Sequence, residues 1–347
     1  MSEQLGKIYT PWDTPPAEAE AIQIADGVLW IRMPLPMVLD HVNIYALDEG
    51  DSWTIVDTGI RSKRAAALWD KILSGPLGGK PVSRVILTHH HPDHIGMAGY
   101  LIDRFGAELV MTRTAFLTAR MLILDVEERP TPQALTFWQR AGMDPEVYNT
   151  RKEERPYNFG DICAPVPVGY TRVQQGDVIS AAGRQWDVHI GNGHAPEHLT
   201  LWSQSDNLVI AGDQIISSIS PNIGVYPTEP EADPVGEWLE ACARLSKLAR
   251  EDHLVLSGHK LPFTGLPKRM QQLVENHHGA LARLQCHLAE PKTAAECFAP
   301  LFKRKIDHGT YGLALVEAVA HLNHLYQSGA VTRSLRDDGA WLWHSKG

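Results

Sequence analysis

The residues most able to do chemistry lie in the segment 88–96, which reads THHHPDHIG. It holds the pattern His-x-His-x-Asp-His at His89, His91, Asp93 and His94. Imidazole nitrogens and carboxylate oxygens are ligands that zinc, iron and manganese bind in proteins. Side chains two positions apart on an extended loop can converge on one ion, and the Asp-His pair beyond them can face a second ion. The segment therefore predicts a metal site, in preference to a solvated loop.

Three further candidate ligands follow apolar runs later in the chain. They are His194, Asp213 and His259, and a glycine directly precedes each of them. Glycine lets the backbone turn sharply at such a position. Taken with the segment 88–96, the set predicts two divalent metal ions per chain. We expect zinc first, with iron or manganese as alternatives, because the set contains no thiolate that would select a softer ion.

Short apolar runs of strand length precede each group of candidate ligands. They alternate with helix-like patterns, such as 61–73 and 235–249, and this alternation predicts an α/β fold. The ends of the strands would then present the ligands on a rigid sheet. The predicted strands lie at 28–33, 42–47, 53–56, 84–88, 108–111, 185–190, 199–202, 208–210 and 254–256.

These motifs resemble those of the metallo-β-lactamase superfamily of binuclear metallohydrolases. The matching motifs are the His-x-His-x-Asp-His segment, Asp57 in VDTG, His194 in GHAPEH, Asp213 in AGD and His259 in SGH. The resemblance covers about residues 28–263. It implies an αββα sandwich with the site along one edge, and a water or hydroxide between the two ions as the nucleophile.

The resemblance also implies a role for each residue. Asp57 would be a buried carboxylate that orients the ligand loops. His198, four residues after His194, would support the ligands or touch the substrate, or be a simple packed histidine. The catalytic candidates are Asp93, Asp213 and His198. The implied ligands are His89, His91 and His194 for the first metal, Asp93, His94 and His259 for the second, and Asp213 between them.

The chain is expected to have two domains. Residues 1–265 would form the catalytic domain, with an insertion at about 115–170 that we interpret as a lid or pocket wall, or else as a packed surface helical hairpin. Residues 266–347 are helical and resemble the small winged-helix-like C-terminal domain of a subgroup of cytosolic relatives. That subgroup includes thioesterases and RNA-cleaving enzymes.

Charge and composition restrict the partners. Residues 1–265 carry 22 basic and 34 acidic side chains, and residues 266–347 carry 10 and 7. The net charge of −9 disfavours nucleic acid and anionic membranes as partners of the whole chain. No apolar stretch approaches the length of a membrane span, and no secretory signal is visible, so we expect a cytoplasmic protein. A homodimer is allowed, because the sequence does not set the oligomeric state.

The donor set most resembles the glyoxalase II group of thioester hydrolases. The leading hypothesis is therefore hydrolysis of an anionic acyl thioester of glutathione, coenzyme A or a carrier. Two alternatives are a single-strand RNA endonuclease and a lactonase, and a third is a non-catalytic binding module. The candidate substrate-binding residues are Tyr170, Tyr226, Lys303, Arg304 and Lys305.

Overall fold

The computed structural model describes residues 6–302 and 305–346, so Lys303 and Arg304 lie outside the described residues. It divides into two compact units, and each unit takes in several stretches of chain. The first unit comprises the chain up to Val126, Asn158–Pro221 and Arg244–Met270. The second comprises Glu127–Tyr157, Asn222–Ala243 and the chain from Gln271 onward.

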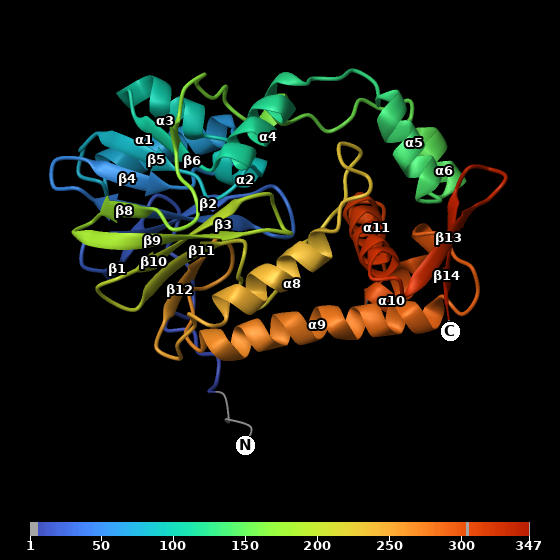
Figure 1. The fold of residues 1–347 in the computed structure, drawn as a ribbon. Coiled ribbons are helices and arrows are strands. Elements are labelled where there is room, and N and C mark those ends of the chain that lie inside the picture. The colour runs from blue at the N-terminus through green and yellow to red at the C-terminus, as the bar shows by residue number, and fades with distance from the viewer. Residues whose placement is uncertain (1–5, 303–304, 347) are drawn as a thin grey trace. The chain divides into compact units, whose positions relative to one another are not determined.

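Two sheets lie face to face in the first unit (Figure 1). The first has seven strands in sequence order, antiparallel from β1 to β4 and parallel from β4 to β7. The second has five strands in the order β12-β11-β10-β9-β8, of which only β11 and β12 are parallel. The strands are β1 Ala21–Ala25, β2 Val28–Pro34, β3 His41–Asp48, β4 Trp53–Val56, β5 Val82–Ile86, β6 Glu108–Met111, β7 Thr171–Arg172, β8 Val178–Ala181, β9 Arg184–Gly191, β10 His198–Ser203, β11 Leu208–Gly212 and β12 Leu254–Ser257.

Apolar side chains fill two layers of this unit. One core lies between the sheets, where Trp30 of β2 and Trp186 of β9 belong to the same buried cluster. The other lies outside the first sheet, where helices contribute Trp69 and Phe116. Burying such a side chain contributes about 1.5–3 kcal/mol. The helices of this unit are α1 Lys63–Ser74, α2 Pro92–Ile95, α3 Ala98–Phe105, α4 Arg113–Leu124 and α7 Phe159–Ile162.

Local sequence explains the helix that follows β4. The side chain of Ser62 accepts a hydrogen bond from the backbone N–H of Ala65, which caps the N-terminus of α1. Trp69 packs its ring in the core and donates its indole N–H to the carbonyl of Thr58 at 2.9 Å. The helix therefore fixes the turn that follows β4, where Asp57 lies. The prediction of an α/β sandwich of two sheets is confirmed.

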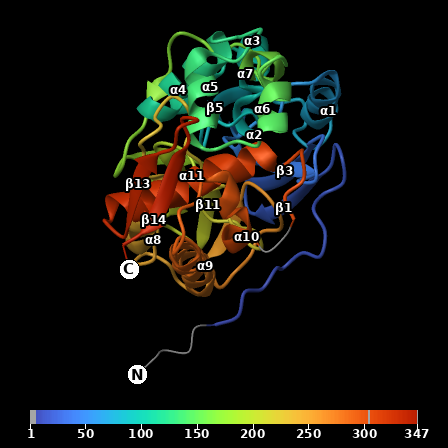
Figure 2. The same ribbon diagram turned by 90° about the vertical axis from the view of Figure 1, so that its right-hand side faces the viewer.

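The second unit is mainly helical and ends in a two-stranded hairpin (Figure 2). Backbone pairing holds the inserted segment 127–157 to the C-terminal part, because the N–H of Ala295 donates to the carbonyl of Ala141 at 3.1 Å. The hydroxyl of Tyr311 also accepts a hydrogen bond of 2.9 Å from the N–H of Asp144. The elements here are α5 Pro132–Arg140, α6 Pro145–Arg151, α8 Pro234–Leu245, α9 Leu266–His287, η1 Ala295–Cys297, α10 Phe298–Leu301, α11 Tyr311–Gln327, β13 Val331–Leu335 and β14 Trp341–Ser345; α8 and α9 each extend into the first unit.

These units differ from the predicted boundary between residues 265 and 266. Helix α9 begins at Leu266, at the predicted start of the C-terminal domain, but the two units divide within this helix, between Met270 and Gln271. The segment 127–157, predicted as part of the catalytic domain, clusters with the C-terminal helices. The physical reason is that hydrogen bonds join this segment to the C-terminal part, from the N–H of Ala295 to the carbonyl of Ala141 and from the N–H of Asp144 to the hydroxyl of Tyr311. None of the described helices is both long and apolar enough to cross a membrane.

Candidate metal centre

Each candidate ligand lies just beyond the end of a strand, as predicted. The segment after β5 carries His89 and His91 and continues into the short helix α2, which holds Asp93 and His94. His194, Asp213 and His259 follow β9, β11 and β12 of the second sheet. The two sheets thus supply ligands to one cluster, and all of these residues belong to the first unit.

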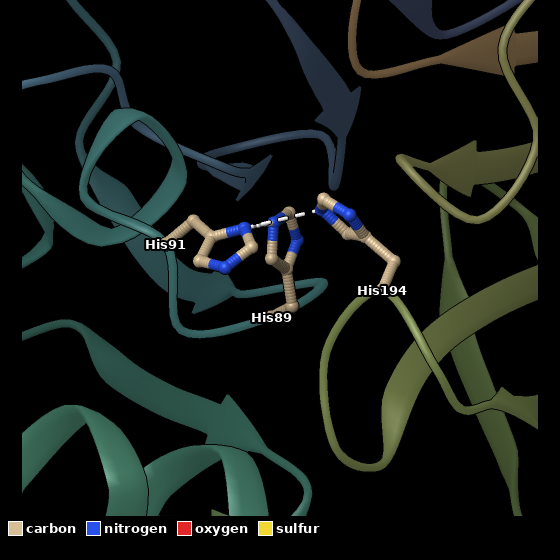
Figure 3. Close-up of side chains that lie close together, drawn as sticks. All are labelled: His89, His91 and His194. Atoms are coloured by element: carbon tan, nitrogen blue, oxygen red, sulfur yellow. Dashed lines mark hydrogen bonds between the residues drawn. The ribbon is translucent and has the colours of Figure 1, made fainter. Parts of the chain in front are cut away.

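Three imidazoles converge in the first group of donors (Figure 3). The Nδ1 atom of His91 lies 3.0 Å from Nε2 of His89 and 3.1 Å from Nε2 of His194. Nitrogen donors about 2.1 Å from a tetrahedral zinc ion would be about 3.4 Å apart, so this spacing fits one ion among the three.

A second group of donors surrounds the carboxylate of Asp213. Its Oδ1 atom lies 3.5 Å from Nε2 of His94, and its Oδ2 atom lies 3.2 Å from Nε2 of His259. Oδ2 is also 3.5 Å from Nε2 of His194, which belongs to the first group. Asp93 completes the set, with Oδ2 3.2 Å from Nε2 of His259. One carboxylate therefore faces the histidines of both groups, which is the arrangement that a bridging ligand requires.

Hydrogen bonds fix which nitrogen of each imidazole faces the cluster. The hydroxyl of Thr88 donates to Oδ2 of Asp57 at 2.8 Å and accepts from Nδ1 of His89 at 2.9 Å. The same carboxylate accepts from Nδ1 of His94 at 2.8 Å. Nδ1 of His259 donates to the backbone carbonyl of His41 at 2.8 Å. Protons held on Nδ1 leave the Nε2 lone pairs of all three ligands for a cation.

The electrostatics of the cluster favour the binding of a cation. Burial disfavours a charged imidazole, yet the neighbouring carboxylates outweigh it and raise the pKa of His94 well above its ordinary value. In His259, too, burial opposes the charge, but Asp213 and Asp93 together raise the pKa to about 10. Against the cost of burial, these imidazoles in turn hold the pKa of Asp213 well below its usual range.

Metal ions fit this electrostatic demand better than protons do. The buried atoms Nε2 of His94 and Oδ1 of Asp213 have no hydrogen-bond partner among the described residues. A buried polar atom without a partner costs about 1–3 kcal/mol. In His89 and His91 the pKa shifts in the opposite direction to that of His94 and His259. Burial, with other imidazoles nearby, lowers the pKa of both well below its ordinary value. Neutral imidazoles beside ionised carboxylates form the donor set of a divalent metal site.

Two glycines make room for the close approach of these ligands. A Cβ atom on Gly258 would meet Oδ1 of Asp213 and would lie 2.8 Å from Cε1 of His94. Gly212 has a φ of +48° and would place a Cβ atom 2.6 Å from Cε1 of His198. Both positions therefore require glycine next to the predicted ligand that follows.

The structure also locates the other predicted site residues. His198 is fully buried and stacks on His89 with ring centroids 4.7 Å apart, and its Nε2 accepts the backbone N–H of Asp213 at 3.1 Å. This geometry gives it a supporting position. Tyr170 stacks on Phe116 at 3.9 Å and packs against the core on the helix side of the first sheet. Tyr226 and the exposed Lys305 belong to the second unit.

Sequence reasoning missed Thr88 and His41 as parts of the centre. Thr88 adjoins the motif, and a hydroxyl before a ligand histidine is a signal that could have been used. His41 acts through its backbone carbonyl, which any residue carries, so no sequence signal could have found it. Asp57 lies where the resemblance implied, 2% exposed and with a left-handed φ of +62°.

The fold and the cluster together define a class of protein: two facing sheets with a cluster of histidine and aspartate donors beyond the strand ends. Residues 37–259 match the model of the metallo-β-lactamase superfamily, and the chain belongs to this superfamily. Residues 281–346 match the family described as the metallo-β-lactamase-like C-terminal domain.

Several known proteins are similar along most of the chain. A β-lactamase domain protein from Burkholderia ambifaria is 35% identical, with a TM-score of 0.90 over 97% of this chain and 98% of that one. A metallo-β-lactamase family protein from Thermus thermophilus is 25% identical, with a TM-score of 0.77 over 93% and 100%. The probable metallo-hydrolase YqjP of Bacillus subtilis is 25% identical over 88% of this chain and 94% of its own length.

Proposed function

We propose that this chain is a binuclear metal-dependent hydrolase that cleaves an anionic acyl thioester of glutathione, coenzyme A or a carrier. The observation that carries the binuclear part is the position of Asp213. Its two carboxylate oxygens face different histidines, Oδ1 toward His94 and Oδ2 toward His194 and His259. A single side chain that serves two groups of donors supports two neighbouring ions, with zinc as the first choice and iron or manganese as alternatives.

The residues of the chain prepare this site for hydrolysis. Asp57 and the carbonyl of His41 hold Nδ1 protons, so that Nε2 of His94 and His259 stays directed at the cluster. His198 accepts the N–H of Asp213 and so fixes the backbone of the bridging ligand. The side chain of Asp93 is 20% exposed, which leaves this part of the cluster open to solvent. Two divalent cations held here would activate water and polarise the carbonyl of the substrate.

The choice of a thioester depends on the donor set. It contains nitrogen and oxygen donors alone, and in this respect resembles the glyoxalase II group. The name of the Bacillus subtilis relative supports hydrolase chemistry in general. The order of α9, α11 and the β13–β14 hairpin supports a winged-helix-like C-terminal part. The small-molecule partner, the homodimer and the cytoplasmic location are further parts of this proposal.

A substrate panel tests the proposal. The purified full chain, loaded in turn with zinc, manganese and iron, would be given acyl-glutathione, acyl-coenzyme A, lactones, phosphodiesters and single-stranded RNA. We expect release of free thiol, measured with a chromogenic thiol reagent, with kcat/KM about 100-fold or more above that for the other classes. The matched control is Asp213→Asn, which should abolish the turnover. Turnover of lactones, phosphodiesters or RNA without turnover of any thioester would contradict it.

A further inference from the structure

The second unit contains a cavity of about 380 Å³. Its walls come from α5, the segment 227–231, α11 and the β13–β14 hairpin, all within that unit. This volume lies within the roughly 300–1,000 Å³ that small-molecule sites occupy. The inserted helix α5 thus lines a cavity of its own unit, whereas its predicted role as a lid or pocket wall of the catalytic site stays a prediction. None of the predicted metal ligands lines the cavity.

Two arginines meet at the aromatic wall of this cavity. The guanidinium carbon of Arg333 lies 4.5 Å from the ring centroid of Trp341, and that of Arg140 lies 4.9 Å from the same ring. Arg333 also lies over the rings of Tyr326 and Trp343, at 4.6 and 5.3 Å. Contacts with aromatic faces hold a guanidinium in place without using its N–H groups, so these donors stay available.

The two guanidiniums have few protein acceptors. Arg140 donates from Nη1 to the carbonyl of Gly339 at 3.0 Å, and no other hydrogen bond of its side chain is present within the described ranges. Arg333 pairs with Glu231 at 2.8 Å, and the side chain of Glu231 is 60% exposed. The lining therefore holds two guanidiniums and one exposed carboxylate, which pairs with Arg333, so the wall of the cavity keeps a net positive charge.

The rest of the lining is suited to an apolar body. Pro227, Pro230, Phe137 and Val319 contribute apolar surface. The ring of Trp343 adds an aromatic face to this lining. The cavity thus combines unused donors with an apolar surface.

We propose that this cavity binds a small organic anion, whose phosphate or carboxylate group pairs with Arg140 and Arg333 and whose apolar body lies against the proline and aromatic side chains. Arginine suits such groups because its planar fork donates two parallel hydrogen bonds. This site is independent of the proposed hydrolase function and would exist whatever the metal centre cleaves.

Calorimetric titration of the zinc-loaded full chain tests the proposal. The probes are 2-naphthoate and phenylphosphonate, which separate carboxylate from phosphate recognition, and neutral 2-naphthamide and inorganic phosphate. At least one organic anion should bind about tenfold or more tightly than both 2-naphthamide and inorganic phosphate. Equal binding of the neutral amide, equal binding of inorganic phosphate, or no binding of either organic anion would overturn the proposal.

Variants locate the binding. Arg140→Gln should lower the affinity for the organic anion about tenfold, and Arg140→Lys should lower it less. Lys346→Gln, which removes an exposed charge from the same unit, should leave the affinity unchanged. An anion bound only at the metal centre would bind wild type and Arg140→Gln equally, and that result contradicts the proposal. If Arg140→Gln does not fold, Glu231→Gln provides the test. This variant removes the carboxylate that competes for Arg333, so the organic anion should bind severalfold more tightly. An unchanged affinity would contradict the proposed site.

Discussion

The carboxylate of Asp57 accepts a hydrogen bond of 2.8 Å from Nδ1 of His94, and both side chains are buried. The same carboxylate also accepts the hydroxyl and the backbone N–H of Thr88. Asp57 therefore orients His94 directly and His89 through Thr88, although it is in none of the groups of metal donors. One buried acid behind the cluster thus sets the direction of ligands from both groups.

Asp57→Asn should therefore lower metal affinity while leaving the ligands in place. An amide is uncharged and presents one acceptor oxygen instead of two, so His94 and Thr88 lose part of their fixed orientation. Loss of such a partner behind a ligand typically costs about 10–100-fold in affinity. Competition with a chromogenic zinc chelator measures this. The control is Asp51→Asn at an exposed position, which should bind metal as wild type does. Wild-type affinity in Asp57→Asn would show that the orientation of these ligands does not depend on Asp57.

Asp213→Ala should remove metal and activity together. Its two oxygens face His94 on one side and His194 with His259 on the other, so both groups of donors lose a ligand at once. Elemental analysis after dialysis should fall from about two equivalents of metal per chain to fewer than one. Retention of two equivalents would refute the bridging position.

Gly258→Ala should lower both the stability of the chain and its metal affinity, because the added methyl group would clash with neighbouring ligands. The added methyl group would meet Asp213 and would lie 2.8 Å from Cε1 of His94, and both neighbours are buried. We expect a stability loss of about 1–3 kcal/mol by chemical denaturation and a metal affinity at least about tenfold lower. Gly169→Ala is the matched control, because a Cβ atom there meets nothing within 4 Å. Equal effects of both substitutions would show that the space at residue 258 is not required.

Acid should destabilise the second unit through a buried histidine pair. His321 donates from Nδ1 to the carbonyl of Glu317, so its Nε2 accepts from Nδ1 of His277 at 3.2 Å, and both rings are neutral. Burial lowers the pKa of His277 to about 3 and that of His321 to about 4. A second histidine contact lies nearby, where Nδ1 of His324 is 3.0 Å from Oδ2 of Asp233.

The sign of the pH effect follows from these lowered pKa values. Above pH about 6.5 the histidines are neutral in the folded and the unfolded chain, and the pair is indifferent to pH. Below that pH the two histidines become protonated in the unfolded chain but stay neutral in the folded chain, so the free energy of unfolding falls. Each histidine should lower the free energy of unfolding by about 2 kcal/mol at pH 5. Urea unfolding at a series of pH values from 7.5 to 5 measures this free energy. His277→Gln should flatten the profile and His278→Gln, at an exposed position, should not. Parallel profiles would contradict this account.

The sequence alone identified the candidate ligands that the structure brings together, because strong local constraints mark them. A histidine-rich segment after an apolar strand, and glycines directly before His194, Asp213 and His259, are features of neighbouring residues. Most strands of the first unit could be predicted for the same reason, since the alternation of apolar and polar residues is a short-range pattern. Strands β1, β7 and β8 were not predicted. The alternation of these elements predicted an α/β fold, and the arrangement in two facing sheets was implied by the resemblance of the motifs to the metallo-β-lactamase superfamily.

Tertiary structure decided what depends on residues far apart in the chain. The carbonyl of His41 reaches His259 across 218 positions, and no side-chain type signals a backbone acceptor. The segment 127–157 joined the C-terminal unit because its helices pack there, which local periodicity does not specify. Arg140 and Arg333 meet over Trp341 for the same reason. Sequence determined which donors the chain carries, whereas packing determined which of them converge, because convergence depends on distances in space and not along the chain.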